Sequence, residues 1–595
     1  MRNKAVKLNK NKPQNFFKAW KNLLGEFRDY KFPTIFALIL AFVANILFLM
    51  TPKKVGDISN EVKKAINGNI DLEMIQSIAT VAIVYMLMGA IFLYTQEFII
   101  VTVVQKLSRG LRNKIAIKIN KIPLQYFDNN STGDILSRVT NDVDLISQTL
   151  YMGMSSFIGA ITSMIGSLYM MSTTNLVLTG AAVGATLIGF LIMFIIMKLS
   201  QKYFFKQQST LGELNGYIEE VYEAHVLVKT YNARDEVTEK FDKVNDRLYN
   251  SVWKAEFLSR FMHPVMNFIG NLGYVAIAII GARLVSNNVI TFGVIVSFMM
   301  YIRQFTHPLT SLAQIATTMQ GAAAASERVF EFLNEEELED ESYKKEYLNP
   351  EEVEGNVKFS NISFGYNPNK KIINNFSVEV ESGQKVAIVG PTGAGKTTIV
   401  NLLMKFYEID DGRILIDGVS IKDITRENIA DLFCMVLQDT WIFEGTVYEN
   451  ISYNSNKTKE QVIEIAKSIG LHHFVEALSD GYDTVLNSKV SISQGQRQLI
   501  TIARAMAKDA PMLILDEATS NVDTRTELVI QKAMDKLMKG KTSFVIAHRI
   551  STIENADLIL VLDKGDIIES GDHDELMEQE GFYYNLYNSQ FEEAV

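Results

Sequence analysis

Long uncharged runs occupy most of the first half of the chain, and each is long enough to cross a bilayer at about 1.5 Å of helical rise per residue. One run is twice the necessary length, and its polar segment Ser172–Asn175 predicts a hairpin there. Ser286–Asn288 is the expected turn before the last run. The pattern predicts six transmembrane helices. The runs are Phe32–Thr51, Met74–Gln96, Leu145–Met197, Phe261–Ala282 and Ile290 to about Thr317.

Basic residues are concentrated before the first uncharged run, which places this end in the cytoplasm by the positive-inside rule. Six spans then leave both termini cytoplasmic. Apolar residues within 1–31 recur at helical spacing between lysines, which favours a helix lying in the membrane interface, with a core-facing helix of a soluble cap as the alternative. They are Phe16, Phe17, Trp20, Leu23, Leu24 and Phe27. The first long apolar run lacks a small-residue cleavage site, so no cleavable signal peptide is expected.

Two connections on the cytoplasmic side are long and have a helical pattern, about Lys106–Asp144 and about Lys198–Lys254. Helices there would project tens of ångströms beyond the membrane. In the first, the segment from Pro123 to Asp128 predicts that the helix breaks and restarts. In the second, Gly212–Gly216 predicts either a solvated bend or a tip that touches the soluble domain.

Arg303 interrupts the last uncharged run about 20 Å along its helical rise, which predicts a position in the inner half of the bilayer. An ionisable residue there is costly unless it faces a cavity or a partner. We therefore expect Arg303, with Gln304 and His307 nearby, to line a translocation pathway. A structural ion pair or a snorkelling side chain is the alternative.

Composition agrees with a membrane half followed by a soluble half. The 595 residues are 48% hydrophobic and 21% charged, with the charges concentrated outside the long runs. A net charge of −10 gives no support for a nucleic-acid partner. The single cysteine, Cys434, excludes an intramolecular disulfide framework, and we expect a buried structural thiol there, with a reactive thiol as the alternative.

A phosphate-binding loop is predicted in the soluble half, between an apolar strand-like run and a helix-like run. Its glycines let backbone N–H groups turn toward a polyphosphate, and the helix N-terminus adds its positive end. Lys396 would reach the β and γ phosphates, and the Thr397 hydroxyl would bind Mg²⁺. The loop consists of Gly390, Pro391, Thr392, Gly393, Ala394, Gly395, Lys396, Thr397 and Thr398.

Polar residues that follow other strand-like runs complete the expected site. Asp516 would position Mg²⁺, and the adjacent Glu517 would polarise the attacking water. Gln438 can offer an amide oxygen to Mg²⁺ or orient water, and His548 could contact a γ-phosphate. Tyr366, upstream of the loop, could stack on adenine or could simply pack.

A second helix start suited to phosphate lies at Ser493, Gln494, Gly495 and Gln496. One nucleotide hardly needs two unrelated helix N-termini at its γ-phosphate. We therefore expect this segment to serve an ATP held by a second subunit.

The whole chain resembles a half-transporter of the ABC exporter family. The resemblance implies a multi-pass α-helical membrane domain, with six transmembrane helices and long intracellular extensions, fused to an α/β P-loop ATPase domain. It also implies that two chains sandwich two ATPs and that closure drives export of an amphiphilic, multidrug-type compound. The expected parts are a cytoplasmic N-terminus with an interfacial helix (1–31), a transmembrane domain (32–326), a linker (327–354) and a nucleotide-binding domain (355–595). The matched motifs are the Walker A loop at Gly390–Thr398, the Walker B pair at Asp516 and Glu517, the Q-loop at Gln438, the signature at Ile492–Gln496, the D-loop at Ser520–Asp523, the switch histidine at His548 and the A-loop at Tyr366.

Two features depart from the family pattern. Gln494 stands where the signature has a glycine, and the segment before it, from Asn487 to Ser491, lacks the usual acidic loop. With Asn521 and Val522 in the D-loop, the chain resembles the catalytically complete member of bacterial heterodimeric multidrug exporters. That resemblance favours a different partner chain in a bacterial plasma (inner) membrane, and a homodimer is the alternative. A peptide or lipid exporter, and an ATP-gated sensor or channel, are further alternatives.

Overall fold

The computed structural model describes residues 15–64, 70–367, 370–487, 490, 492–516, 523–547 and 550–592. The chain forms two compact units. The helical unit contains Met1–Asn120 and Ser131–Glu335, and the second unit, called here the ATPase unit, contains Lys121–Asn130 and Glu336–Val595. The short segment Lys121–Asn130 therefore belongs with the C-terminal part of the chain, although it lies between two helices of the other unit.

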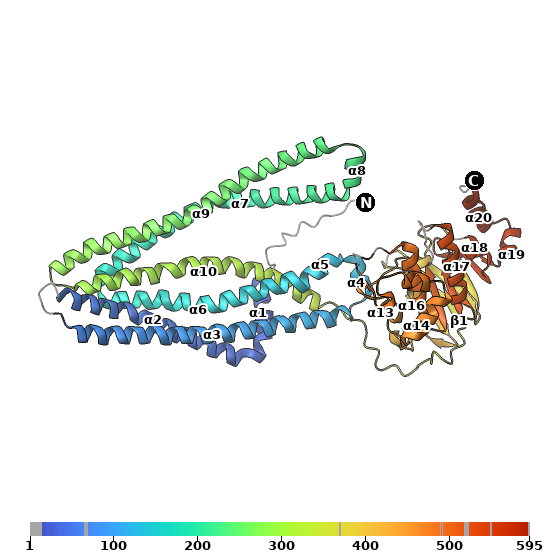
Figure 1. The fold of residues 1–595 in the computed structure, drawn as a ribbon, viewed down its shortest axis with the longest axis horizontal. Coiled ribbons are helices and arrows are strands. Elements are labelled where there is room, and N and C mark those ends of the chain that lie inside the picture. Colours follow the sequence, from blue (N-terminus) through green and yellow to red (C-terminus); the bar gives the residue numbers. More distant parts are fainter. Residues whose placement is uncertain are drawn as a thin grey trace. The chain divides into compact units, whose positions relative to one another are not determined.

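The described residues of the helical unit form helices joined by short turns (Figure 1). The two turns predicted from polar residues are confirmed, because one helix ends at Thr174 and the next begins at Leu176, and another pair meets across Asn287–Thr291. The helices are α1 (Phe16–Glu26), η1 (Phe27–Tyr30), α2 (Lys31–Lys64), α3 (Leu72–Ile119), α5 (Thr132–Ser137), η3 (Arg138–Asp142), α6 (Val143–Thr174), α7 (Leu176–Glu223), α8 (His225–Thr230), α9 (Arg234–Ser286) and α10 (Phe292–Leu333).

Five helical stretches of the described residues are long and apolar enough to cross a membrane by length and composition. The sixth expected span lies within α10. The first five are Phe16–Lys64, Leu72–Ile119, Thr132–Thr174, Leu176–Glu223 and Asn267–Ser286.

Helices α2, α3, α6 and α10 pack into one bundle. The Tyr301 hydroxyl donates to the Leu49 carbonyl at 3.2 Å, and Ser297 donates to the Pro52 carbonyl at 2.9 Å, which fixes the register of α10 against α2. The first turns of α10 therefore pack beyond Thr51, where the first apolar run ends. Arg303 consequently lies beside the middle of α2, between Tyr301, which contacts Leu49, and Gln304, whose amide approaches the Phe48 carbonyl. Its expected position in the inner half of the bilayer stays a prediction.

Helices α7 and α9 run side by side and are joined by the short helix α8 (Figure 1). The expected bend at Gly212–Gly216 is absent, because α7 continues through both glycines to Glu223. Contacts with α9 hold this part of α7: Arg247 forms an ion pair with Glu213 at 2.6 Å, and the Tyr217 hydroxyl donates to the Val237 carbonyl at 3.0 Å. The tip of this connection is α8 instead.

The predicted break in the first long connection is confirmed. Helix α3 ends at Ile119, and the chain restarts as α4 (Leu124–Asn129) with Pro123 at its N-cap. Helix α10 continues to Leu333, into the segment expected to be a linker from 327 onward. Buried Ala322–Ala325, Val329 and Phe332 hold the end of α10 in its bundle.

The ATPase unit alternates strands and helices from Val357 onward, as predicted. The strands are β1 (Val357–Phe364), β2 (Ile373–Val380), β3 (Lys385–Val389), β4 (Asp411–Ile416), β5 (Val419–Ser420), β6 (Phe433–Val436), β7 (Gly445–Thr446), β8 (Val485–Leu486), β9 (Met512–Asp516), β10 (Thr542–Ile546), β11 (Leu558–Asp563) and β12 (Asp566–Gly571). The helices after α4 are α11 (Lys396–Leu403), α12 (Arg426–Leu432), α13 (Val447–Ser452), α14 (Lys459–Ser468), α15 (His472–Glu476), η4 (Gly481–Asp483), α16 (Gln494–Lys508), α17 (Thr524–Met538), α18 (Ile550–Glu554), α19 (His573–Glu578) and α20 (Phe582–Glu592).

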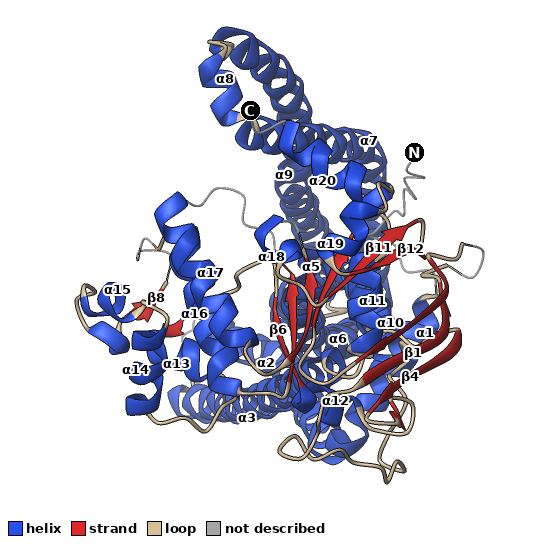
Figure 2. Ribbon diagram, turned by 90° about the vertical axis from the view of Figure 1, so that its right-hand side faces the viewer, coloured by secondary structure: helices blue, strands red, loops and turns tan. Residues whose placement is uncertain are grey.

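Most of the described strands form a six-stranded sheet in the order β12-β11-β3-β10-β9-β6 and a four-stranded antiparallel sheet in the order β2-β1-β4-β5 (Figure 2). Strands β7 and β8 pair with each other. Strands β6, β9, β10, β3 and β11 are parallel to one another, and the edge strand β12 is antiparallel to β11. One apolar core lies between the larger sheet and helices α13, α14, α16 and α17, and another lies between the two sheets around α11. The carboxyl ends of these parallel strands therefore lie at one edge of the sheet, where ligands bind in open α/β sheets.

Candidate nucleotide-binding site

The phosphate-binding loop joins β3 to α11, as predicted. Gly390, Gly393 and Gly395 have positive φ angles of 151°, 86° and 105°. A Cβ on Gly390 would lie 2.2 Å from the Leu562 carbonyl oxygen, whereas a Cβ on Gly393 would meet nothing within 4 Å. The loop therefore needs glycine for its backbone at each position, and it leaves open space at Gly393, where a phosphate group would approach.

Lys396 lies across this loop. Its ammonium donates to the carbonyl oxygens of Gly390 at 2.7 Å and Pro391 at 3.2 Å. Burial lowers the pKa of Lys396, and the carboxylate of Asp516 partly offsets that effect. The Thr397 hydroxyl is on the exposed side of the loop, whereas Thr398 is buried. The lysine and one hydroxyl thus lie where the sequence predicts a polyphosphate.

The carboxyl edge of the six-stranded sheet brings further predicted residues to the same loop. Asp516 ends β9 and pairs in register with Ile546 of β10, which in turn pairs with Ile388 of β3. Gln438 follows β6 and is exposed. Parallel register therefore places Asp516 and Gln438 at the same edge of the sheet as the loop, Asp516 two strands and Gln438 three strands away from β3. Glu517, His548 and Ser520–Val522 lie outside the described residues.

Tyr366 is half-buried beside the loop. Its hydroxyl is 3.4 Å from the Thr398 hydroxyl and accepts from the Asn401 amide at 3.3 Å. Its ring packs edge-on against Tyr407, with ring centroids 4.9 Å apart, and against Phe364 at 5.0 Å. The tyrosine is therefore held next to the loop by an aromatic cluster. The sequence offered no signal for Tyr407, which lies eleven residues after Lys396.

The predicted signature residues form the start of α16. The Ser493 hydroxyl accepts from the Gln496 amide at 3.2 Å, and the Gln496 side chain accepts from the Ser493 amide at 2.9 Å, which makes a capping box. Gly495 is buried, whereas the Gln494 side chain is exposed at the helix end. The Gln494 side chain can consequently contact a group that approaches the N-terminus of α16 from outside.

Two more polar residues secure the helices next to these motifs. Asp523 caps α17 by accepting from the Thr526 amide at 3.0 Å, and its hydrogen bonds to Thr526 lower its pKa. Arg504 of α16 donates to the Asn450 carbonyl at 2.8 Å and to the Trp441 carbonyl at 3.1 Å. Arg504 therefore connects the signature helix to the loop that contains Gln438, a link that no sequence motif indicated.

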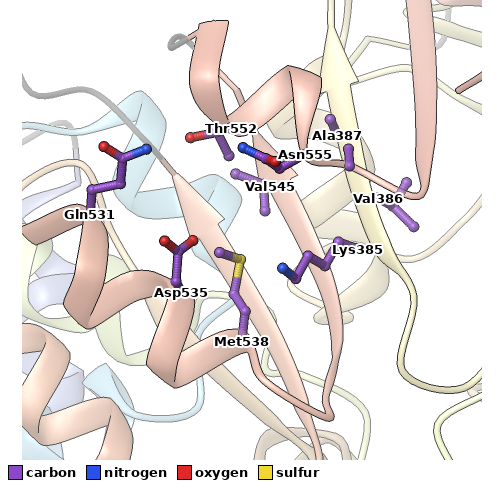
Figure 3. A pocket seen from close by; sticks show the side chains of 10 residues that line it. Lys385, Val386, Ala387, Gln531, Asp535, Met538, Val545, Thr552 and Asn555 are labelled. Atoms are coloured by element: carbon purple, nitrogen blue, oxygen red, sulfur yellow. The ribbon is translucent and has the colours of Figure 1, made fainter. Parts of the chain in front are cut away.

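A cavity of about 20 Å³ lies at the beginning of β3, between α17 and α18 (Figure 3). Lys385, Asp535 and Met538 are among its lining residues. The phosphate-binding loop follows the other end of β3. Because this volume accommodates about one water molecule, the cavity is not a nucleotide site.

The predicted pathway residues in α10 do not all share one face. Arg303 and His307 are exposed and lie one helical turn apart, but Gln304 is half-buried and its amide lies 3.5 Å from the Phe48 carbonyl of α2. None of the described carboxylates forms an ion pair with Arg303. The exposed face of α10 therefore presents a guanidinium in an apolar helix.

Comparison with protein families gives two matches. Residues 34–309 match the model described as ABC transporter transmembrane region, and residues 373–520 match the model described as ABC transporter. Together the two matches account for most of the helical unit and for the core of the ATPase unit.

Relatives with both regions in one chain are similar over most of their length. A fatty acid ABC transporter ATP-binding/permease protein of Mycobacterium bovis is 42% identical over 519 residues, 87% of this chain and 82% of that protein. An uncharacterized ABC transporter ATP-binding protein of Bacillus subtilis, YfiC, is 39% identical over 94% of this chain and 92% of its own length. A probable multidrug resistance ABC transporter ATP-binding/permease protein of the same organism, YheH, is 33% identical over 84% of this chain and 74% of its own length.

Proposed function

Because this chain belongs to the ABC transporter family, as an exporter-type half-transporter that couples ATP hydrolysis to transport, we propose that it exports an amphiphilic compound across a bacterial plasma membrane. The observation that carries the proposal is the glycine-built phosphate loop, with Lys396 across it, in the same chain as a set of membrane-spanning helices. Both termini are cytoplasmic in this proposal, because the basic residues precede α2.

The residues at the carboxyl edge suit a nucleotide with Mg²⁺. Thr397, Gln438 and Asp516 offer a hydroxyl, an amide and a carboxylate, and Mg²⁺ favours few protein ligands completed by substrate phosphates. When bound, Mg²⁺ would neutralise charge on the phosphates. Lys396 binds the β and γ phosphates, Glu517 polarises the attacking water, His548 contacts the γ-phosphate, and Tyr366 stacks on adenine.

A second half-transporter completes the site in this proposal. Ser493, Gln494, Gly495 and Gln496 begin α16 with an exposed face and would serve the ATP of the partner chain, with Asp523 nearby in the D-loop. A glutamine in place of the signature glycine favours a different partner chain. ATPase activity of this chain purified alone in lipid, with chains counted per particle, tests it. Robust hydrolysis by a two-chain particle would overturn the heterodimer.

The exposed face of α10 supports an acidic amphiphile as the cargo. Arg303 and His307 are exposed there, and a guanidinium facing lipid would be costly, whereas one facing a pathway can pair with a carboxylate. A relative named as a fatty acid transporter supports the same chemistry. We therefore assign Arg303 to recognition of the headgroup of a fatty-acid-like substrate, with His307 beside it.

Uptake into inside-out vesicles tests the transport and its cargo. We expect ATP-dependent accumulation of a labelled fatty acid, none with Glu517→Gln, and roughly tenfold less with Arg303→Gln, the loss typical of a charged hydrogen bond. Arg303→Lys keeps the charge and should retain most uptake, and a neutral amphiphile should be unaffected by either change.

Failure has distinct meanings in this assay. ATP hydrolysis without concentrative uptake of any amphiphile would contradict export and favour a gated channel or sensor. Equal uptake by the Arg303→Gln vesicles would contradict the headgroup assignment alone. Undiminished turnover by Glu517→Gln would contradict the assignment of that carboxylate.

A further inference from the structure

Both chain segments that lead from the ATPase unit to the membrane helices contact one short stretch, Met404–Ile409, directly after α11. Lys405 forms an ion pair with Glu341 of the linker at 2.7 Å. The Tyr407 hydroxyl donates to the carboxylate of Asp128 in α4. Because α11 begins with Lys396, these contacts are made one helix length from the phosphate-binding loop.

Tyr407 is also part of the aromatic cluster that holds Tyr366. The two rings are edge-to-face, with an interplanar angle of 84°, and Phe364 contacts both, at 5.0 Å from Tyr366 and 5.7 Å from Tyr407. In an edge-to-face pair, rotation of one ring changes the packing of the other. The orientation of Tyr366 is therefore tied to that of Tyr407.

The ring of Tyr407 packs against Tyr366, and its hydroxyl is held by the hydrogen bond to Asp128. Tyr407 is half-buried, and burial together with the Asp128 carboxylate raises the pKa of its hydroxyl. The phenol consequently remains a protonated donor over the pH range in which proteins of this kind are studied. Asp128, exposed on α4, is the acceptor in this contact.

The position of Asp128 does not depend on Tyr407 alone. Ile122 before α4 is buried, the Lys121 carbonyl accepts from the Leu338 amide at 2.7 Å, and Lys121 lies 3.6 Å from Glu337. Helix α4 is covalently continuous with α3 on one side and α5 on the other. Asp128 is therefore held by the contacts of Lys121 and Ile122 as well as by its own hydrogen bond to Tyr407.

We propose that Asp128 and Tyr407 are positioning residues for recognition of the nucleotide base: the carboxylate on α4 orients Tyr407, and Tyr407 orients the face of Tyr366. This inference rests on the proposed role of Tyr366 in stacking on adenine. By linkage, base binding and the position of α4 then affect each other equally.

The test measures the KM for ATP and for UTP, which share the triphosphate but differ in how well the base stacks. The assay uses the full transporter with its partner chain in lipid. The substitution Tyr407→Phe removes only the hydroxyl that donates to Asp128. We expect the KM for ATP to rise about threefold, within the range of an aromatic pair, with kcat unchanged. The KM for UTP, whose smaller base stacks less, should not change. Asp128→Ala should reproduce this pattern, and Asp128→Asn, which keeps an acceptor oxygen, should restore the ATP KM.

Tyr587→Phe is the matched control, because Tyr587 also donates to a carboxylate, Glu554, elsewhere in the unit. It should alter neither KM. In a Tyr366→Leu background, Tyr407→Phe should have no further effect. If Tyr366→Leu raises the ATP KM but Tyr407→Phe does not, or if both nucleotides respond equally, the positioning role is overturned. If Tyr366→Leu itself has no effect, the stacking role of Tyr366 fails instead.

Discussion

Replacing Glu341 by glutamine should loosen the linker from the ATPase unit. The carboxylate is 10% exposed and accepts from Lys405 at 2.7 Å, from Lys344 at 2.9 Å and from the Arg426 amide at 2.6 Å. Burial alone would raise the pKa of Glu341, but hydrogen bonds from the two lysines and the amide outweigh it and lower the pKa from 4.5 to about 2.

The lowered pKa gives the size of the effect. At about 1.4 kcal/mol per pKa unit, a change from 4.5 to about 2 corresponds to about 3 kcal/mol of stabilisation at pH 7. Because the folded pKa lies below the unfolded one, this stabilisation is complete above pH 4.5 and is lost as the pH falls toward 2. Glu341→Gln should therefore forfeit about 3 kcal/mol at neutral pH.

Amide hydrogen exchange of the full chain in lipid measures this loss. Peptides covering 341–348 and the Arg426 amide should exchange roughly 100-fold faster in Glu341→Gln, as about 3 kcal/mol implies. Glu464→Gln, which breaks an exposed ion pair with Lys467, is the matched control and should change exchange about twofold at most.

A change at Lys405 tests the same reasoning in the opposite direction. The Lys405 side chain is 1% exposed, so in Glu341→Gln its charge would be buried without the carboxylate that neutralises it. Lys405→Met in the Glu341→Gln background removes the uncompensated charge and should recover part of the protection. Exchange in Glu341→Gln within threefold of the wild type would refute the reasoning. A carboxylate with four donors, from Lys344, Lys405 and both the backbone amide and the guanidinium of Arg426, would then contribute almost nothing.

Two further outcomes follow from the site. Gly390→Ala should abolish retention of a fluorescent ATP analogue, because its Cβ would lie 2.2 Å from the Leu562 carbonyl oxygen. Gly216→Ala is the control and should retain the analogue, because Gly216 is helical and a Cβ there would meet nothing within 4 Å. Equal binding by the two variants would contradict this account of the loop. Burial raises the pKa of the Cys434 thiol, so N-ethylmaleimide should label the folded chain negligibly and the denatured chain fully by mass spectrometry. Rapid labelling of the folded chain would mean that β6 opens.

Local chemistry was predictable from the sequence. The Gly390–Thr398 loop needs glycines at fixed spacing between a strand and a helix. All of these features lie in consecutive residues and can be recognised from the sequence alone. The polar turn at Ser172–Asn175 was visible for the same reason, because an uncharged run of twice the bilayer length must fold back on itself.

Tertiary pairing decided what the sequence could not predict. Tyr407 and Asp128 are 279 residues apart, and neither belongs to a local pattern that indicates the other. Glu341 lies in a stretch whose charge content is typical of a solvated linker, yet its carboxylate is buried by cations from later in the chain. Gly212 and Gly216 favour a bend locally, but packing of α7 against α9 keeps them helical.

The inclusion of Lys121–Asn130 in the ATPase unit bears on how such proteins can be engineered. Consider a chimera in which only the chain after Glu336 is replaced by that of a relative. The native Asp128 would then face the relative's residue at the position of Tyr407, and the relative's ATPase unit would contact an α4 that is not its own. Residues 121–130 should therefore be exchanged together with the C-terminal part. In this protein the unit that can be exchanged, the ATPase unit, consists of two separate segments of the sequence.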